Sequence, residues 1–169
     1  MLNITRDTGE FLSVLVRATA ARRILEIGTS NGYSTLWLAE AAKATGGSVT
    51  TVELSPGKAA LARATFARSG LGTLVDLVED DAGRFLERAR QAAFDLVFLD
   101  SERSEYPRWW PRLDGLLRPG GLLVADNATS HAAEMAPFVA LLAGDPRYTS
   151  CLVPVGNGEF LAVKAGEAA

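Results

Sequence analysis

Four acidic side chains stand at or just past segments with strand-like patterns, and they define what this chain can bind. They are Glu53, Asp81, Asp100 and Asp126. The carboxyl ends of parallel strands meet at one rim of a sheet, so we expect the four carboxylates to gather there. One such residue alone is more often a helix cap or a solvated turn residue. Four on one rim repel one another unless a cation or hydrogen-bond donors offset their charge, so together they predict a binding site.

Asp100, Asp126 and Asn127 form a second and more specific group within this set. All three present oxygen atoms, which hard divalent cations such as Mg²⁺ and Ca²⁺ prefer as ligands. The three residues therefore predict a cation site. The alternative is that Asp126 and Asn127 only cap the turn that follows them.

A turn bracketed by glycines, Gly28-Thr29-Ser30-Asn31-Gly32, separates an apolar run from a helical segment. Glycine has no Cβ, so the N–H groups at the helix start can approach a ligand closely. Glu53 follows at about the spacing at which dinucleotide-binding folds place an acid on a ribose diol. The turn lacks the third glycine of G-x-G-x-x-G, which favours a nucleoside without a diphosphate. A tight turn with nothing bound is the alternative.

The segments that must hold these residues alternate between strand and helix patterns. We expect strands at 24–27, 48–52, 74–78, 94–99, 122–125, 149–155 and 159–164, and helices at 2–20, 33–42, 56–67, 82–92, 106–117 and 132–143. This order predicts a doubly wound α/β fold with a mostly parallel, seven-stranded sheet and a C-terminal antiparallel hairpin. Ligands bind such sheets where the strand order reverses.

Glycine, proline and short polar residues mark the ends of several of these segments. Gly46-Gly47 is expected to end the second helix, and Asp7 or Thr8 to cap the first. Pro119-Gly120-Gly121 predicts a turn before the fifth strand, and Gly156-Asn157-Gly158 predicts the loop of the hairpin.

Composition limits the partners and the compartment. The chain has 169 residues, 48% of them hydrophobic, and a formal net charge of −3. This length suits a single domain over 1–169 with a short helical lead over 1–20. Nothing argues for nucleic acid or a membrane as partner: there is no basic tract, no signal-like start and no run long enough to cross a bilayer. The single cysteine, Cys151, predicts a reducing cytoplasm.

The stretches LEIGTSNGYST, TVELSP, FLDSERSEY and LLRPGGLLVADN stand in this order along the chain. They resemble the successive motifs of class I S-adenosylmethionine-dependent methyltransferases, most closely the cation-dependent O-methyltransferases of the catechol and caffeoyl-CoA type. The resemblance runs from about Thr8 onward, and the ADN ending after RPGG, with Asp100 upstream, is its most specific part. It implies a Rossmann-like methyltransferase fold, S-adenosyl-L-methionine as cofactor and methyl transfer to a hydroxyl of a small, catechol-like acceptor.

The resemblance also implies a role for each matching residue. The implied cofactor-binding residues are Glu26, Gly28, Thr29, Ser30, Tyr33, Ser34, Glu53, Leu54, Asp81, Ala82 and Asp100. Among them Glu53 accepts hydrogen bonds from the ribose hydroxyls, Leu54 lies against the adenine, and Asp81 and Ala82 lie at the adenine edge. The implied cation ligands, Asp100, Asp126 and Asn127, hold the cation that orients two neighbouring oxygens of the acceptor.

Arg103 departs from the family, in which a lysine three residues after the first aspartate helps to deprotonate the acceptor. Arginine stays protonated and is a poor general base, but it can stabilise an oxyanion. We therefore assign Asp100 and Arg103 to catalysis. The alternative for Arg103 is a solvated side chain beside Glu102 and Glu105. His131 is either a base near the acceptor or an exposed residue at a helix start.

Several points stay open at the level of sequence. Trp109 and Trp110 either wall an aromatic acceptor or pack a helix onto the sheet, and Tyr106 has the same two alternatives. The short lead before the first strand leaves the acceptor site open, completed by a partner subunit in a homodimer, or suited to a larger substrate. The competing functions are a metal-independent methyltransferase on another nucleophile and a non-catalytic S-adenosylmethionine-binding module. A nicotinamide-dependent oxidoreductase is disfavoured by the missing third glycine.

Overall fold

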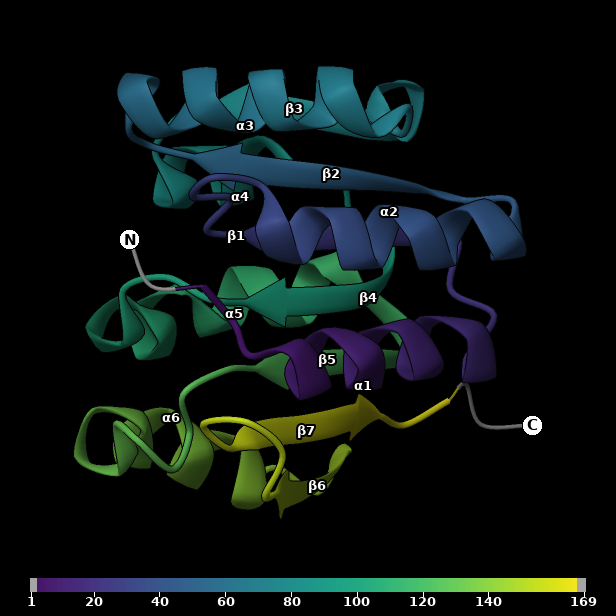
Figure 1. Cartoon of the computed structure of the whole chain (residues 1–169). Helices are drawn as coiled ribbons and strands as arrows, with labels where there is room; N and C mark the ends of the chain where they lie inside the picture. The colour runs from purple at the N-terminus through teal and green to yellow at the C-terminus, as the bar shows by residue number, and fades with distance from the viewer. Residues whose placement is uncertain (1–2, 167–169) are drawn as a thin grey trace.

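A seven-stranded sheet runs through the middle of the computed structural model, which describes residues 3–166 (Figure 1). The strands are β1 (Arg23–Ile27), β2 (Ser48–Glu53), β3 (Val75–Glu79), β4 (Phe94–Leu99), β5 (Leu117–Ala125), β6 (Tyr148–Val153) and β7 (Glu159–Lys164). Their order in the sheet is β3-β2-β1-β4-β5-β7-β6. Neighbours from β3 to β5 pair in parallel, whereas β7 pairs antiparallel with both β5 and β6. The predicted fold class and C-terminal hairpin are confirmed.

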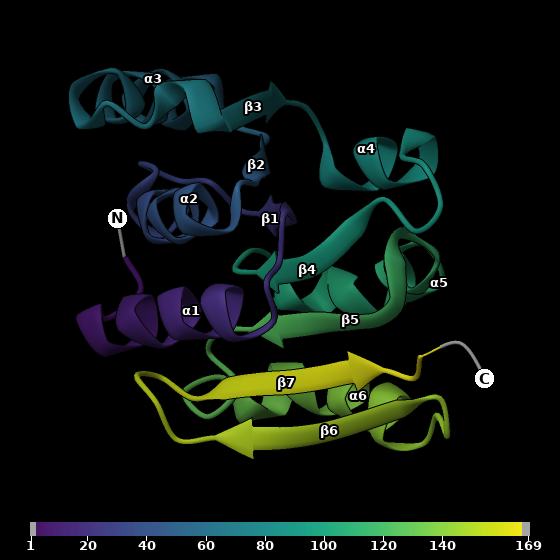
Figure 2. The same ribbon diagram turned by 90° about the vertical axis from the view of Figure 1, so that its right-hand side faces the viewer.

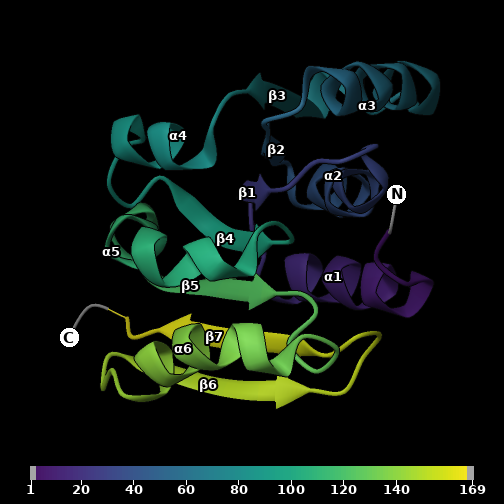
Figure 3. The same ribbon diagram turned by 90° about the vertical axis from the view of Figure 1, so that its left-hand side faces the viewer.

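In the described part of the chain, six α-helices cover the two faces of the sheet. They are α1 (Arg6–Ala18), α2 (Tyr33–Thr45), α3 (Pro56–Ser69), α4 (Ala82–Arg88), α5 (Tyr106–Leu116) and α6 (Ala132–Ala143). The first three lie on one face and the last three on the other, as the two side views show (Figures 2 and 3). Two short 3₁₀ helices, at Gly72–Leu74 and Arg103–Glu105, lead into β3 and α5 respectively. Within residues 3–166, every helix is too short or too polar to cross a membrane.

Burial on both faces explains why most positions of the central strands are apolar. In β4, Leu96 and Phe98 pack into the core under α1 and α2, whereas Val97 and Leu99 pack into the core under α4, α5 and α6. All of these side chains are fully buried. A strand whose side chains alternate between two cores is apolar on both faces, which is typical of parallel sheets.

Three local predictions are corrected by the structure. The segment Pro119-Gly120-Gly121 lies inside β5 and forms an irregularity, because the pairing with β4 jumps from Phe94–Leu117 to Leu96–Leu122. Gly120 takes a φ of 74° there, which lets the strand bend without ending. Thr5, rather than Asp7 or Thr8, caps α1 by accepting from the Thr8 N–H. Helix α4 ends at Arg88, four residues before the predicted end at 92.

The sheet order creates the crevice in which the predicted site residues gather. β1 and β4 are parallel neighbours at the centre of the sheet. The chain leaves β1 toward α2 on one face and leaves β4 toward α5 on the opposite face (Figure 2). The connections diverge from adjacent strand ends, so a space opens between them at the carboxyl rim.

Candidate active site

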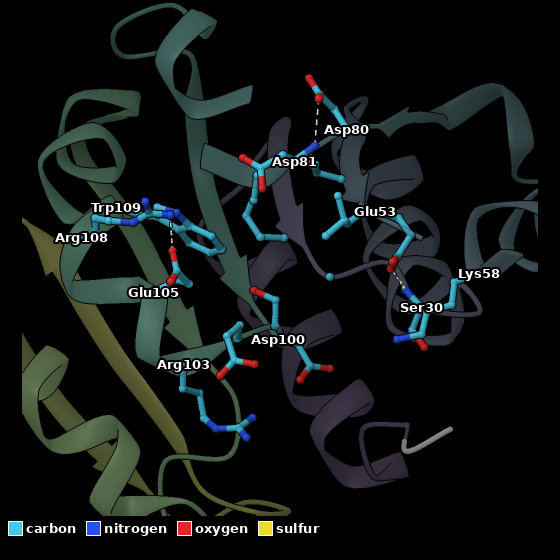
Figure 4. A pocket seen from close by; sticks show the side chains of 17 residues that line it. Ser30, Glu53, Lys58, Asp80, Asp81, Asp100, Arg103, Glu105, Arg108 and Trp109 are labelled. Carbon is cyan, nitrogen blue, oxygen red and sulfur yellow. Dashed lines mark hydrogen bonds and ion pairs between the residues drawn. The ribbon is translucent and has the colours of Figure 1, made fainter. Parts of the chain in front are cut away.

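A cavity of about 740 Å³ opens at this rim, beyond the ends of β1, β2 and β4 (Figure 4). Eight of the predicted site residues line it: Gly28, Ser30, Glu53, Leu54, Asp81, Ala82, Asp100 and Arg103. Lining residues that the sequence analysis did not assign are Lys58, Ser101, Glu105, Arg108 and Trp109, among others. The structure therefore brings the residues predicted for the nucleoside and the residues predicted for catalysis to one shared cavity.

Gly28 allows the ends of β1 and β4 to lie against each other. Its φ is 105°, and a Cβ placed on it would lie 2.1 Å from the backbone oxygen of Asp100. No other residue type fits a backbone approach this close. The turn after Gly28 therefore begins in close contact with Asp100, and Gly28 and Ser30 of this turn line the cavity.

Glu53 is fixed at the rim by backbone donors. Its Oε2 accepts from the Ser30 N–H at 2.8 Å and its Oε1 from the Ser55 N–H at 2.9 Å. The side chain is 7% exposed and lines the cavity. A carboxylate held by two N–H groups keeps lone pairs for a ligand, so Glu53 can accept hydrogen bonds from a diol, the role predicted for it.

Other predicted cofactor residues lie behind the cavity wall. Glu26 is fully buried and accepts hydrogen bonds from the hydroxyls of Ser34, Thr35 and Thr51. Thr29 joins the same network through the Thr51 hydroxyl at 2.6 Å. Burial raises the pKa of Glu26 to about 6, although the three hydroxyls act to lower it. This hydrogen-bond network holds the turn that follows Gly28 in place from inside the protein. A direct cofactor contact for Glu26, Thr29, Tyr33 or Ser34 stays a prediction.

The three residues predicted to hold a cation lie together. The Asn127 amide donates to Oδ1 of Asp100 at 3.2 Å and to Oδ2 of Asp126 at 3.1 Å. Burial raises the pKa of Asp100 to about 7, and the charges of Asp126 and Glu26 add to the rise. Burial is also the largest cause of the raised pKa of Asp126. Crowded, desolvated carboxylates of this kind are stabilised by a nearby positive charge.

The donor set suits a hard cation by its chemistry. The described residues contain no group of three or more Asp, Glu, His or Cys side chains placed to hold a metal. A cation here would therefore rely on two carboxylates and one amide oxygen. The amide of Asn127 carries both an acceptor and a donor end, so it can present oxygen by rotating.

Arg103 lines the cavity and is anchored by α6. Its Nε donates to Oε2 of Glu134 at 2.8 Å, and its side chain is 20% exposed. The alternative of a solvated arginine beside Glu102 and Glu105 is therefore wrong. The positive charge of Arg103 acts to lower the pKa values of Asp100 and Asp126, so it lies within electrostatic reach of both.

The remaining candidates divide clearly. His131 stands at the start of α6, where its Nδ1 pairs with the Ser130 hydroxyl at 2.9 Å, and it is outside the cavity lining. Tyr106 is fully buried, and its hydroxyl accepts from the Ser101 N–H at 2.8 Å. Trp110 packs edge-on against the rings of Phe138 and Tyr148. Trp109 is different, because it both packs in the core and lines the cavity.

Glu159 is a buried acid that sequence reasoning missed. It begins β7, is fully buried, and accepts from the Thr8 hydroxyl at 3.0 Å. Burial, followed by the charge of Asp126, raises its pKa. A glutamate after a hairpin loop normally faces solvent, so only the pairing of β7 with β5 reveals that it lies beside the predicted cation residues.

Comparison with known proteins assigns the chain to a family. A family model described as O-methyltransferase matches residues 1–165. A protein of Mycobacterium avium assigned as an O-methyltransferase is 34% identical over 174 residues, which cover 95% of this chain and 78% of the relative.

Two solved structures share both the fold and part of the sequence. The O-methyltransferase of Bacillus cereus in complex with S-adenosylhomocysteine is 29% identical with a TM-score of 0.84, covering 96% of this chain and 82% of that one. TomG of Streptomyces achromogenes, in complex with S-adenosylmethionine, is 30% identical with a TM-score of 0.86, covering 98% and 82%. The chain therefore belongs to the O-methyltransferase family, the class I S-adenosylmethionine-dependent enzymes of the caffeoyl-CoA and catechol type.

Proposed function

We propose that this enzyme transfers a methyl group from S-adenosyl-L-methionine to a hydroxyl of a small, catechol-like acceptor, with a divalent cation beside Asp100. One observation carries the proposal. Glu53 and Asp81, which suit a nucleoside, line the same cavity as Asp100 and Arg103, which suit an acceptor. The solved relatives in complex with S-adenosylhomocysteine and S-adenosylmethionine support the choice of cofactor.

The cofactor would lie along the carboxyl ends of β1 and β2. Glu53 would accept from both ribose hydroxyls, because its carboxylate is already held in place by the N–H groups of Ser30 and Ser55. Leu54, 66% exposed at the cavity edge, would cover the adenine, with Asp81 and Ala82 at the far edge of the base. Such fixed partners hold the donor so that its methyl group points toward Asp100.

Asp100, Asp126 and Asn127 would hold the cation and, through it, the acceptor oxygens. When bound, the cation lowers the pKa of the acceptor hydroxyl and stabilises the oxyanion. Arg103 adds a permanent positive charge at the same place, and Glu134 fixes that charge in position. Methyl transfer then forms one carbon–oxygen bond as the sulfur–carbon bond breaks, and the hydroxyl proton of the acceptor passes to solvent water. Arg103 cannot take this proton because it is already charged.

A transfer without metal is the second candidate, and Arg103 favours it. A guanidinium can stabilise an oxyanion without the help of a metal ion. The predicted cation site also has only two aspartates, which are accompanied by an amide rather than by a third acid. The two candidates differ in their response to a chelator. Under the first, EDTA abolishes methyl transfer to a catechol panel and Mg²⁺ restores it. Under the second, the rate is unchanged by either addition.

Calorimetry with S-adenosylmethionine, S-adenosylhomocysteine and NAD tests the cofactor directly. We expect binding of the two sulfur nucleosides and none of NAD. If all three fail to bind, the proposed function is wrong. If the nucleosides bind but no acceptor on a broad panel is methylated, the chain is a binding module.

We also infer a cytoplasmic enzyme, since its one cysteine, Cys151, is a free thiol exposed at the surface. A homodimer would complete the acceptor side of the cavity. Light scattering on the purified chain tests this inference, and a monomeric mass at working concentration would contradict it.

A further inference from the structure

Trp109 combines deep burial with an unused donor. The residue lies on α5 and is 8% exposed, packed beside Tyr106 at a centroid distance of 6.0 Å. Its indole Nε1 is buried and has no hydrogen-bond partner within the described part of the chain. Buried indole N–H groups almost always find an acceptor in folded proteins. The indole N–H of Trp109 is therefore expected to have a hydrogen-bond acceptor when a ligand is bound.

The position of this donor shows where the acceptor would come from. Trp109 lines the active-site cavity, and it also lines an adjoining cavity of about 440 Å³. Asp81 lines both cavities as well, so the two residues share one end of the site.

The indole nitrogen of Trp109 and Oδ1 of Asp81 both lie close to Gly83. A Cβ placed on Gly83 would stand 3.4 Å from Nε1 of Trp109 and 3.1 Å from Oδ1 of Asp81. Asp81 uses Oδ1 to cap α4 by accepting from the Arg84 N–H at 3.0 Å. Its second oxygen is not used by this cap. This part of the cavity wall thus carries a carboxylate and an indole N–H, both of them close to Gly83.

We propose that Trp109 is a specificity-determining residue that reads the purine base of the cofactor through its Nε1–H. This inference rests on the proposed function. An acceptor beside a donor matches the edge of a 6-aminopurine, whose exocyclic amine donates and whose N1 and N7 accept on either side of it. Asp81 takes the amine, and Trp109 donates to one of these two ring nitrogens. A 6-oxopurine presents an acceptor where Asp81 needs a donor and is rejected.

The test is a binding measurement that needs no methyl acceptor. Calorimetry compares S-adenosylhomocysteine with its 1-deaza, 3-deaza and 7-deaza analogues on the wild-type chain and on Trp109→Phe. The matched control is Trp110→Phe, since Trp110 is equally buried at 8% and packs on the same helix but does not line the cavity. Circular dichroism and thermal unfolding check that each variant is folded.

We expect Trp109→Phe to weaken binding of S-adenosylhomocysteine about three- to tenfold, the range for one neutral hydrogen bond, and Trp110→Phe to leave it unchanged. For either the 1-deaza or the 7-deaza analogue, the penalty of Trp109→Phe should disappear, because the acceptor is already missing. The 3-deaza analogue should keep the full penalty, since N3 lies on the sugar side of the base.

Two results would overturn the role of Trp109 while leaving the proposed function intact. One is that Trp109→Phe weakens the binding of all three deaza analogues by the same factor. The other is that Trp109→Phe and Trp110→Phe bind S-adenosylhomocysteine with equal affinity. Failure of the wild-type chain to bind S-adenosylhomocysteine would overturn both. If Trp109→Phe does not fold, the analogues on the wild-type chain decide alone. The role then requires that the 1-deaza or 7-deaza analogue binds more weakly than the parent, and equal affinities refute it.

Discussion

Replacing Gly28 by alanine should damage the enzyme far more than replacing another glycine that also has a positive φ. Gly28 has a φ of 105° and would place a Cβ 2.1 Å from the backbone oxygen of Asp100. Gly70, which ends α3, has a φ of 73°, and a Cβ there would meet nothing within 4 Å among the described residues. Both substitutions introduce backbone strain, but only Gly28→Ala adds a steric conflict, so comparing the two variants separates these effects.

The two terms can be estimated separately. A non-glycine residue at positive φ costs about 1–2 kcal/mol, and both variants carry this cost. Real Cβ contacts essentially never fall below 3.0 Å, so at Gly28 the ends of β1 and β4 must move apart by about 1 Å. Forcing extra atoms into packed structure costs about 1–3 kcal/mol more. We expect the free energy of unfolding to fall by about 2–5 kcal/mol for Gly28→Ala and about 1–2 kcal/mol for Gly70→Ala.

Urea unfolding of both variants, followed by calorimetry with S-adenosylhomocysteine, measures these effects. Gly70→Ala should bind the nucleoside with wild-type affinity, because α3 ends away from the cavity. Gly28→Ala should bind at least tenfold more weakly even where it is fully folded, because the turn that lines the cavity has moved. Equal destabilisation by the two substitutions, or normal binding by Gly28→Ala, would refute the steric argument.

Three further predictions concern charge. Arg103→Met should lower kcat by about 100-fold or more, as expected for the loss of an oxyanion-stabilising group, and should leave the cofactor Kd unchanged. A methyl-transfer assay measures the first quantity and calorimetry with the cofactor measures the second. Asp126→Ala should abolish the Mg²⁺ response of methyl transfer, and an intact response would end the metal proposal. Although burial alone would raise the pKa of Asp95, donors from Arg23, Arg22 and Arg118 lower it to about 2. The ionised Asp95 carboxylate should stabilise the fold fully above about pH 4, and this stabilisation should be lost as the pH falls through about 2. In Asp95→Asn this loss of stability in acid should be absent, and the free energy of unfolding at pH 7 should be about 1–3 kcal/mol lower than in the wild-type chain.

Local sequence rules succeeded where a segment's neighbours did not matter and failed where they did. Apolar runs identified the strands because both faces of a parallel sheet are covered, as in β4. Pro119-Gly120-Gly121 has strong turn chemistry, yet β5 continues through it because pairing with β4 on both sides absorbs the extra residues. A turn rule sees only adjacent residues, whereas the sheet partner decides whether a strand ends.

In the candidate site, too, some residues could be placed from their neighbours in sequence and others could not. Glu53, Asp81 and Asp100 could be placed on one rim from sequence, because each follows a strand of a parallel sheet. Glu26 could not be placed so simply. It lies one residue before the last residue of β1 and points into the network below the turn, toward Thr51 of the neighbouring strand.

The fold class, the glycine turn and the placement of Glu53, Asp81 and Asp100 at one rim could be predicted from residue types, because strand ends and turns depend on consecutive positions. The contact of Arg103 with Glu134, the burial of Glu159 near Asp126 and the place of Trp109 in the cavity wall could be seen only in the folded chain. These contacts join segments far apart in the chain. Their geometry depends on how α5, α6 and β7 dock onto the sheet, and no local pattern of residue types records that docking.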